Sequence, residues 1–427
     1  MINNIFFTGT VGIGKSTALK RVLEEVNVSI GGFLTKKNTY QWGSEISITS
    51  LNNYNGTHIF ARVGIGEDIS EAVIDIDTFD TYAVEIIDKS LNSRDIIVMD
   101  ELGVLENKAY KFQQKVYEAI DSEKLVLGIL KQRESEFLDN IRQRANVKVI
   151  EVNEVNRDEC YRIGIDILNQ HGIELKKKDS YLWPQPKIDL YEKALSYEKN
   201  EYPDVFLEKI RSWVPNRKGK SALEIGAGTG AFSIELAKEG VNVTALDSSY
   251  NMLLNLKRKA ELNNVKNIEC IVSPFHRADV EVYDFAVSAY SGNAFSEISS
   301  IQKLYSHINE YAFIICPATN NYHNFNGNEL SRMLGRELKK FSKTVDKLLE
   351  DLHGLRYEYY CEEIEYNFPQ IFDSYEESID YFKKFFHIES EMETVTLKSF
   401  INKYITKEED VFIFDNIKKG AFVVLKK

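Results

Sequence analysis

Gly9-Thr10-Val11-Gly12-Ile13-Gly14-Lys15-Ser16 is the stretch that decides how the first part of this chain folds. It fits the pattern G-x-x-x-x-G-K-[ST] and follows the apolar run Ile5-Phe6-Phe7, which is typical of a buried strand. Glycines let such a loop curl so that its backbone N–H groups face phosphate oxygens. A helix starting near Lys15 points the positive end of its dipole at the same place. The stretch therefore predicts a phosphate-binding loop between a strand and a helix.

The residue types of this loop indicate how phosphates and a metal would be held. Lys15 is expected to reach the β- and γ-phosphates and to act in catalysis, and Ser16 is expected to be a ligand of Mg²⁺. The predicted nucleotide-binding residues are Gly9, Thr10, Val11, Gly12, Ile13, Gly14, Lys15, Ser16 and Thr17.

A second apolar run, Ile96-Ile97-Val98-Met99, ends in the acidic pair Asp100-Glu101. A buried strand that ends in a carboxylate is where P-loop enzymes hold magnesium. Asp100 is therefore predicted to bind Mg²⁺ through a water, and Glu101 to be the base that polarises the attacking water. The alternative, a solvated acidic turn, is weaker because the pair follows an apolar strand in the same domain as the phosphate loop.

Arg133, Arg142 and Arg144 follow the apolar run at 125–130. Arg133 is the favoured candidate for an internal arginine finger, because it lies just past the end of a strand, where open α/β sheets bind ligands. The alternative is that all three are surface arginines of a helix. Residues 45–61 have the character of a β-hairpin, with turn residues at 52–56.

Residues 1 to about 170 resemble the cancer-related nucleoside triphosphatases, which have a RecA-like core. The resemblance rests on the phosphate loop, on Gly31-Gly32-Phe33-Leu34-Thr35, on the acidic stretch 100–106 and on Asn156-Arg157-Asp158. It implies Mg²⁺-dependent hydrolysis of ATP, GTP and other nucleoside triphosphates. The family carries a Glu and an Arg shortly after the Gly-Gly-Phe-x-Thr run. This chain has Lys36-Lys37 there, which is compatible with weak turnover.

A second glycine-rich turn lies in Leu223-Glu224-Ile225-Gly226-Ala227-Gly228-Thr229-Gly230, before a helix predicted at 231–238. The spacing G-x-G-x-G alone is a weak signal, because dinucleotide-binding folds carry a similar one. The strand that follows, at 241–246, ends in Asp247. A carboxylate about 20 residues past such glycines accepts hydrogen bonds from the ribose hydroxyls of an adenosine. Glu224 on the first strand separates this pattern from the dinucleotide one.

This arrangement resembles class I S-adenosylmethionine-dependent methyltransferases over roughly residues 186–427. The resemblance places Glu224 near the methionine amino group. It places Met252 on the adenine, although ordinary helix core is an equal alternative. Ser273 stands where the family commonly has an Asp that reads the adenine. The predicted cofactor-binding residues are Glu224, Gly226, Ala227, Gly228, Thr229, Gly230, Asp247, Ser248, Met252 and Ser273.

The methyl acceptor is predicted to lie at the loop after the strand 283–288, where Tyr290 and Asn293 are the candidate catalytic contacts. A nucleophilic role for Cys316 is set aside, because a cysteine on a buried strand usually acts as a small hydrophobe. An acidic and aromatic insert at about 318–405 is predicted to form a helical substrate lid together with helices at 186–214. Residues 411–414 and 421–425 are predicted to pair as antiparallel strands.

The charge run Lys176-Lys177-Lys178 and the prolines of Trp183-Pro184-Gln185-Pro186 indicate a linker. The predicted organisation is α/β throughout. The chain is predicted to begin with a RecA-like P-loop nucleoside triphosphatase domain (1–171). A linker (172–186) connects it to a Rossmann-like class I methyltransferase domain (187–427).

The composition narrows the class of protein. Among 427 residues, 28% are charged and the net charge is −12, which disfavours nucleic acid as a partner. No apolar run is long enough to cross a membrane. Four scattered cysteines fit a reducing cytoplasm.

These features favour a bifunctional cytoplasmic enzyme. Its expected ligands are a nucleoside triphosphate, Mg²⁺, S-adenosylmethionine and a small-molecule methyl acceptor. Three alternatives stay open. One is an RNA-modifying methyltransferase with a remodelling triphosphatase. Another is a methyltransferase whose nucleotide-binding domain regulates it and hardly hydrolyses. The third is a degenerate cofactor domain that only binds S-adenosylmethionine.

Overall fold

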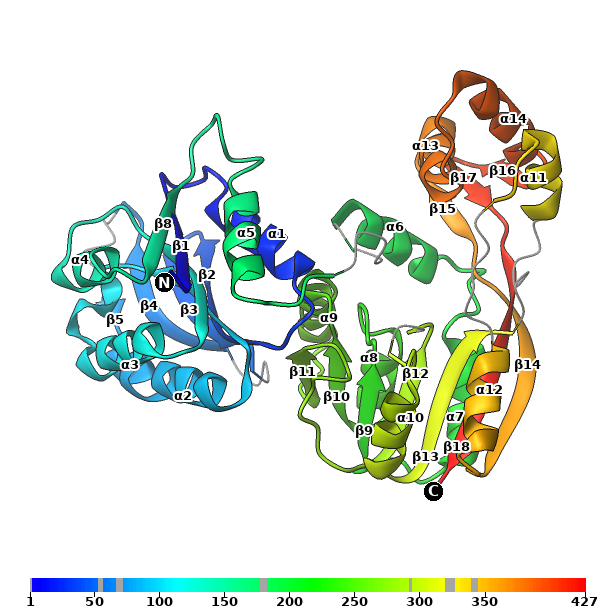
Figure 1. Cartoon of the computed structure of the whole chain (residues 1–427), viewed down its shortest axis with the longest axis horizontal. Helices are drawn as coiled ribbons and strands as arrows, with labels where there is room; N and C mark the ends of the chain where they lie inside the picture. The colour runs from blue at the N-terminus through cyan, green and yellow to red at the C-terminus, as the bar shows by residue number, and fades with distance from the viewer. Residues whose placement is uncertain are drawn as a thin grey trace. The chain divides into compact units, whose positions relative to one another are not determined.

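A computed structural model (Figure 1) describes residues 2–52, 57–66, 72–176, 183, 185–291, 294–318, 327–338 and 345–427, and for 327–328 the backbone only. The chain forms two compact units. One consists of residues 1–183 and 244–280, and the other of 184–243 and 281–427. Among the described helices, none combines the length and apolarity that crossing a bilayer requires.

The N-terminal residues form an eight-stranded sheet in the order β5-β4-β3-β2-β6-β7-β1-β8. Strands β2, β6, β7, β1 and β8 run parallel, whereas β3, β4 and β5 extend the sheet in antiparallel pairs. The strands are β1 Asn4–Thr8, β2 Ile30–Tyr40, β3 Gly43–Ser50, β4 Thr57–Gly64, β5 Val73–Ile74, β6 Ile96–Leu102, β7 Leu125–Leu130 and β8 Val147–Glu151. The helices are α1 Lys15–Glu25, η2 Thr78–Ala83, α2 Val84–Ser93, η3 Leu105–Lys108, α3 Tyr110–Asp121, α4 Glu136–Arg142 and α5 Tyr161–Gln170.

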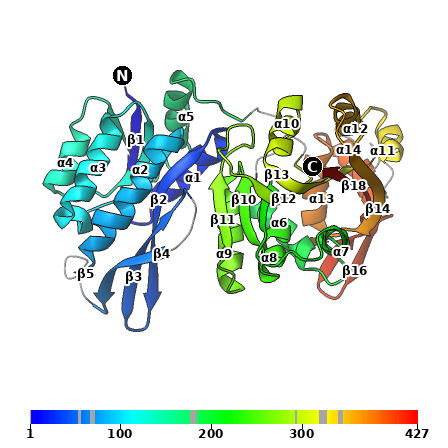
Figure 2. The same ribbon diagram turned by 90° about the horizontal axis from the view of Figure 1, so that it is seen from below.

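The central strands of this sheet are almost wholly buried, which explains their apolar sequences. Every residue of β1 and β7 is buried, as expected for parallel strands that helices cover on both faces. The strands predicted at 96–99 and 125–130 are both present. The predicted hairpin is β3 and β4, and its turn residues 53–56 lie outside the described part of the chain. Figure 2 shows β2, β3 and β4 side by side.

The core on one face of this sheet is built from aromatic rings. Phe112 contacts Phe33, Phe79 and Phe137, and Phe79 also contacts Phe60, with ring centroids 4.5 to 6.4 Å apart. Burying aromatic side chains of this size contributes a large share of a domain's hydrophobic stabilisation.

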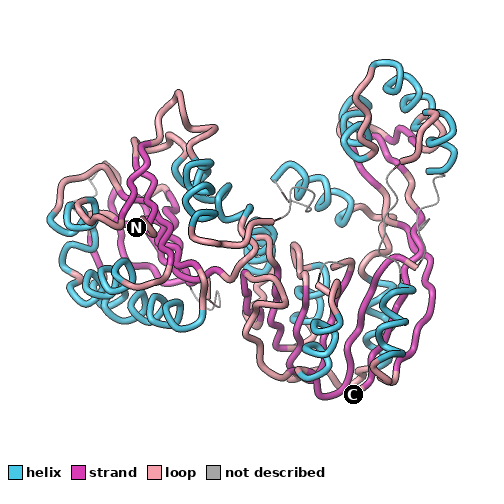
Figure 3. The backbone as a smooth tube through the Cα atoms, in the orientation of Figure 1, coloured by secondary structure: helices cyan, strands magenta, loops and turns pink. Residues whose placement is uncertain are grey.

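The second sheet has seven strands in the order β11-β10-β9-β12-β13-β18-β14. β12 pairs in parallel with β9 and β13, and β18 lies antiparallel between β13 and β14. The strands are β9 Ser221–Ile225, β10 Asn242–Asp247, β11 Ile268–Val272, β12 Tyr283–Ala289, β13 Ile308–Pro317, β14 Tyr359–Asn367 and β18 Ile417–Lys426. The helices along the chain are α6 Gln185–Ser196, α7 Asp204–Trp213, α8 Ala231–Lys238, α9 Tyr250–Leu262 and α10 Ile298–Ser306. Figure 3 shows how strands and helices alternate.

The segment predicted as a helical lid contains strands as well as helices. Its described helices are α11 Gly327–Leu334, α12 Val345–Gly354, α13 Tyr375–Phe385 and α14 Glu391–Ile401. The strands β15 Gln370–Phe372, β16 Ile405–Glu408 and β17 Val411–Phe414 form a separate sheet, whereas β14 belongs to the main one. α11, α13 and α14 share a core with this small sheet, in which the rings of Phe382 and Phe414 are 4.5 Å apart.

The predicted pairing of residues 411–414 with 421–425 is wrong. β17 pairs with β15 and β16, and β18 pairs with β13 and β14. The reason is burial: Phe414 is buried in the core shared with α11, α13 and α14, whereas Phe422 and Val423 are buried in the main sheet. Two adjacent apolar runs thus complete two different cores.

Candidate functional sites

The phosphate loop runs from the end of β1 to the start of α1. Gly9 has a φ of +147°, and a Cβ there would lie 2.5 Å from the carbonyl oxygen of Val152. No residue with a side chain fits that position without moving the backbone. Gly14 caps α1 with a left-handed conformation, so the free N–H groups of the first turn begin directly after the loop. The loop therefore has the geometry that the sequence predicts.

Lys15 lies over this loop. It is buried, and its Nζ donates hydrogen bonds of 2.9 Å to the carbonyl oxygens of Gly9 and Thr10. Ser16 and Thr17 in the first turn of α1 are exposed. A buried ammonium group beside the free backbone N–H groups of a helix N-terminus is suited to binding the phosphates of a nucleotide.

Asp100 is buried and lies near the carboxyl end of β6, a strand of the same sheet as β1. Burial and the neighbouring Glu101 raise its pKa to about 7, whereas Lys20 and Lys15 act in the opposite direction. A buried carboxyl group beside a second carboxyl group favours neutralisation by a cation. Ser16 and Asp100 therefore fit a divalent ion, which would add positive charge beside Lys15.

Three side chains that sequence reasoning did not single out surround Glu101. The Glu101 N–H donates to Thr35 Oγ1 at 3.1 Å, and Lys131 Nζ lies 3.4 Å from Glu101 Oε2. Glu106 Oε2 accepts the N–H of Gly103 at 3.0 Å and is buried. Thr35 and Glu106 lie within the motifs that carry the family resemblance. No sequence motif pointed to Lys131, because only the pairing of β6 with β7 brings it close to Glu101.

Of the three arginines after β7, two already have local partners. Arg142 forms an ion pair with Asp139 and donates to the carbonyl oxygen of Arg133. Arg144 pairs with Asp121 and lies over the ring of Tyr117. Arg133 is exposed, and its guanidinium has no ion pair with any residue that the structure describes.

Glu106 is expected to make the stability of the first unit depend on pH. Burial raises its pKa from 4.5 to about 7, so the folded chain keeps a proton that the unfolded chain releases. The free energy of unfolding should therefore fall as the pH rises from about 4.5 to about 7. Glu106→Gln, which keeps the acceptor for Gly103, should remove about 2–3 kcal/mol of this dependence between about pH 5 and about pH 8. Denaturant titrations of the unmodified chain and of Glu106→Gln at the two pH values would measure the free energy of unfolding. If this free energy changed equally with pH in both proteins, the prediction would be wrong.

The second glycine-rich turn connects β9 to α8. Gly226 has a φ of +72°, and a Cβ there would lie 1.7 Å from Ser291 Oγ. Glu224 is buried and accepts a short hydrogen bond from Ser233. Thr229 is 1% exposed, and its buried Oγ1 has no hydrogen-bond partner among the described residues. A buried, orphaned hydroxyl inside the turn fits a site whose polar partner is a ligand.

Asp247 ends β10, which lies next to β9 in the sheet order. Its Oδ1 accepts the N–H of Ser249 at 2.7 Å, and the carboxylate is half-buried, as is Ser248. The carboxylate is thus fixed and still accessible, as binding of ribose hydroxyls requires.

Met252 is buried, in keeping with the helix-core alternative. Ser273 is also buried, and its hydroxyl donates to the carbonyl oxygen of Pro274 at 3.0 Å. Because the Ser273 hydroxyl donates its proton to Pro274, it can only accept a hydrogen bond from an adenine amino group.

Tyr290 follows β12, whereas Asn293 lies outside the described residues. The Tyr290 hydroxyl accepts a 2.5 Å hydrogen bond from Tyr366 on β14, a residue that the sequence interpretation did not propose. Burial raises the pKa of Cys316 to about 12, so its thiol keeps its proton, in agreement with the decision to set it aside.

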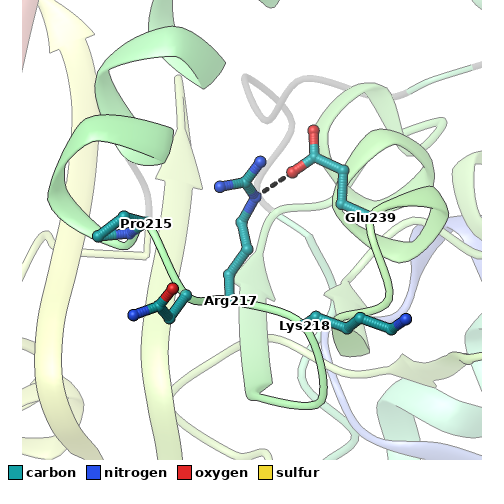
Figure 4. A pocket seen from close by; sticks show the side chains of 5 residues that line it. Pro215, Arg217, Lys218 and Glu239 are labelled. Atoms are coloured by element: carbon teal, nitrogen blue, oxygen red, sulfur yellow. Dashed lines mark hydrogen bonds and ion pairs between the residues drawn. The ribbon is translucent and has the colours of Figure 1, made fainter.

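Figure 4 shows a hollow lined by Pro215, Asn216, Arg217, Lys218 and Glu239. These residues precede β9 or follow α8, so they lie at the end of β9 away from the glycine-rich turn. Ligands of parallel sheets bind at the carboxyl ends of the strands. Glu239 is held here by Arg217 and Arg211, and this hollow is not assigned to the cofactor.

The first site is therefore that of a P-loop nucleoside triphosphatase domain, and the second is that of a class I S-adenosylmethionine-dependent methyltransferase domain. A family profile described as NTPase matches residues 4–163, and one described as methyltransferase domain matches residues 222–312. Nucleoside-triphosphatase THEP1 from Methanocaldococcus jannaschii is 35% identical over 131 residues, which cover 30% of this chain and 76% of that protein. The N-terminal part of the chain thus belongs to the THEP1 nucleoside-triphosphatase family.

Two solved structures are similar to parts of this chain. THEP1 from Aquifex aeolicus is 23% identical, with a TM-score of 0.33, and the match covers 39% of this chain and 98% of that one. Phosphoethanolamine N-methyltransferase 2 from Haemonchus contortus is 13% identical, with a TM-score of 0.42, and the match covers 79% of this chain and 87% of that one.

Proposed function

We propose that the chain is bifunctional. Its N-terminal domain hydrolyses nucleoside triphosphates such as ATP and GTP with Mg²⁺, and its C-terminal domain methylates a small molecule. We place the two domains at 1–171 and 187–427, joined by a linker at 172–186. The observation that carries the first activity is that Lys15 is buried over the carbonyl oxygens of the loop that follows β1, while the buried Asp100 lies on β6 of the same sheet.

In the hydrolysis we propose, water attacks the γ-phosphorus and the bond to the bridging oxygen breaks, giving a nucleoside diphosphate and phosphate. Lys15 stabilises negative charge that develops on the β- and γ-phosphates. Glu101 orients the water and accepts its proton, while Lys131 and Thr35 hold Glu101 in place. Ser16 and Asp100 would hold Mg²⁺, which would supply charge neutralisation at the phosphates. Arg133 is our candidate for a further cation at the γ-phosphate.

For the methyl transfer, alignment supplies much of the catalysis, because the sulfonium group of the cofactor is already activated. Asp247 accepts hydrogen bonds from the ribose hydroxyls, and the turn from Gly226 to Gly230 lets the backbone approach the methionine part. Glu224 lies on the strand beneath that turn. Tyr290 borders the position from which an acceptor reaches the methyl carbon.

Removing the metal tests the first activity. Phosphate release from ATP and from GTP should fall to background when EDTA is added and return with excess Mg²⁺, since the metal neutralises transition-state charge. The assay should be repeated with Ca²⁺, whose looser coordination is expected to restore little activity. Release that is unaffected by EDTA would contradict the metal assignment.

A regulatory role is the second candidate, and Lys36-Lys37 favours it because the family carries Glu and Arg near this position. A regulatory domain would bind nucleotide without releasing phosphate. A titration with a fluorescent ATP analogue, run beside the release assay, separates the two functions.

A further inference from the structure

Lys418 on β18 differs from the other lysines of its strand. Lys419 pairs with Glu363 at 3.2 Å, and Lys426 pairs with Glu358 at 3.1 Å. Among the described residues, Lys418 has neither an ion pair nor a hydrogen bond; its Nζ lies 4.2 Å from the ring centroid of Phe368. Lys418 is half-buried, and desolvation alone lowers its pKa to about 7. An ammonium group in this setting lacks the anion that normally offsets its desolvation.

The strand register shows where Lys418 points. Tyr366 lies opposite Lys418 in the β14–β18 pair, and Gly420 lies two residues further on the same face. A Cβ on Gly420 would be 2.7 Å from the Tyr290 hydroxyl and 2.9 Å from the ring of Phe206. This face of β18 therefore looks toward Tyr290, the residue placed beside the methyl group.

A layer of aromatic rings joins Lys418 to the cofactor turn. The ring of Tyr202 lies 5.6 Å from that of Phe368, 6.1 Å from that of Tyr290 and 5.6 Å from that of Phe232. Phe232 is in the first turn of α8, directly after the glycine-rich turn. Burial raises the pKa of Tyr202 well above its usual range, so its hydroxyl is neutral and provides no negative charge.

From this geometry we propose that Lys418 binds an oxyanion, a carboxylate or a phosphate, on the methyl acceptor, while Tyr202, Tyr290 and Tyr366 contact the rest of that molecule. The proposal rests on the proposed methyltransferase function and names the class of its substrate. The acceptor is an anionic small molecule whose charged group is held on β18 and whose nucleophile reaches the cofactor beside Tyr290. Lys418 is thus a residue that determines specificity, and it takes no part in proton transfer.

Competitive acetylation of the full-length chain, read by mass spectrometry across a range of pH, tests this proposal. Inorganic phosphate, acetate and S-adenosylmethionine are added separately, and Lys419 and Lys426 serve as internal references. Lys418 should titrate near pH 7 in the free protein. Phosphate or acetate should slow its acetylation about 5-fold at pH 7 by raising its pKa by about one unit, without an equal effect on the references. Whichever anion does so at the lower concentration identifies the group.

Three outcomes would overturn the proposal. Lys418 titrating like the reference lysines would mean that it is solvated. Equal acetylation with and without both anions would show that it binds no oxyanion. If only S-adenosylmethionine shifted the pKa of Lys418, the bound anion would be the carboxylate of the cofactor and not a group of the acceptor. Calorimetric binding of S-adenosylmethionine, measured in parallel, tests the methyltransferase function by itself, so failure of either proposal can be told apart.

Discussion

Replacing Lys15 with alanine is expected to lower nucleoside triphosphate hydrolysis roughly 10²–10³-fold, the cost of removing one preorganised donor from a developing charge. The buried ammonium group is held by the carbonyl oxygens of Gly9 and Thr10, so its position is set before a nucleotide binds. The loss should be mainly in kcat, because this interaction strengthens in the transition state. Phosphate release at saturating ATP and GTP would measure it.

Two further variants make this result specific. Lys111→Ala removes an exposed lysine from α3 and should leave hydrolysis unchanged. Lys15→Arg keeps the charge but has a planar head group that does not match the lysine's contacts with the loop, so most of the loss should persist. Binding of S-adenosylmethionine to Lys15→Ala should equal that of the unmodified chain. If the alanine variant hydrolyses ATP normally, the assignment of the phosphate loop is wrong.

Replacing Asp247 with alanine is expected to weaken S-adenosylmethionine binding roughly 100-fold. Two hydrogen bonds from ribose hydroxyls to a carboxylate contribute about 1.5 kcal/mol each at the low end of the charged range, and about 2.7 kcal/mol corresponds to a factor of 100. The Ser249 N–H, which now donates to Asp247, would also lose its acceptor. Isothermal titration calorimetry measures the change directly.

Asp247→Asn separates charge from shape. It keeps an oxygen for Ser249 and for one ribose hydroxyl, so its binding should lie between that of the alanine variant and that of the unmodified chain. Glu281→Ala, at an exposed position, is the matched control and should bind the cofactor normally. Hydrolysis of ATP should be retained in Asp247→Ala. Unchanged cofactor affinity in that variant would contradict the ribose assignment.

Much of the fold was predictable because local patterns carry it. Apolar runs such as 96–99 and 125–130 became central strands, since a strand buried on both faces needs apolar residues throughout. Gly9 and Gly226 were predictable for a related reason, because their backbone conformations exclude side chains. The two domain classes follow from these motifs and agree with the family matches.

The misplaced pairing of β17 shows what local patterns lack. The runs 411–414 and 421–425 are both apolar and close in the chain, and periodicity does not tell which partner strand each one meets. Only the separate core around Phe382 and Phe414 explains why β17 leaves the main sheet. The same applies to Lys131, which meets Glu101 through the pairing of β7 with β6.

By itself, the sequence determined the two glycine-rich loops, the acidic residues near the carboxyl ends of β6 and β10, and hence the two classes of domain. Each of these is a contiguous motif whose chemistry acts through the backbone or the nearest side chain. The tertiary structure alone decided which distant residues join them: Lys131 beside Glu101, Tyr366 against Tyr290, and Lys418 without a carboxylate partner among the described residues. The physical reason is that strand register and burial set these contacts, and both depend on the packing of the whole sheet.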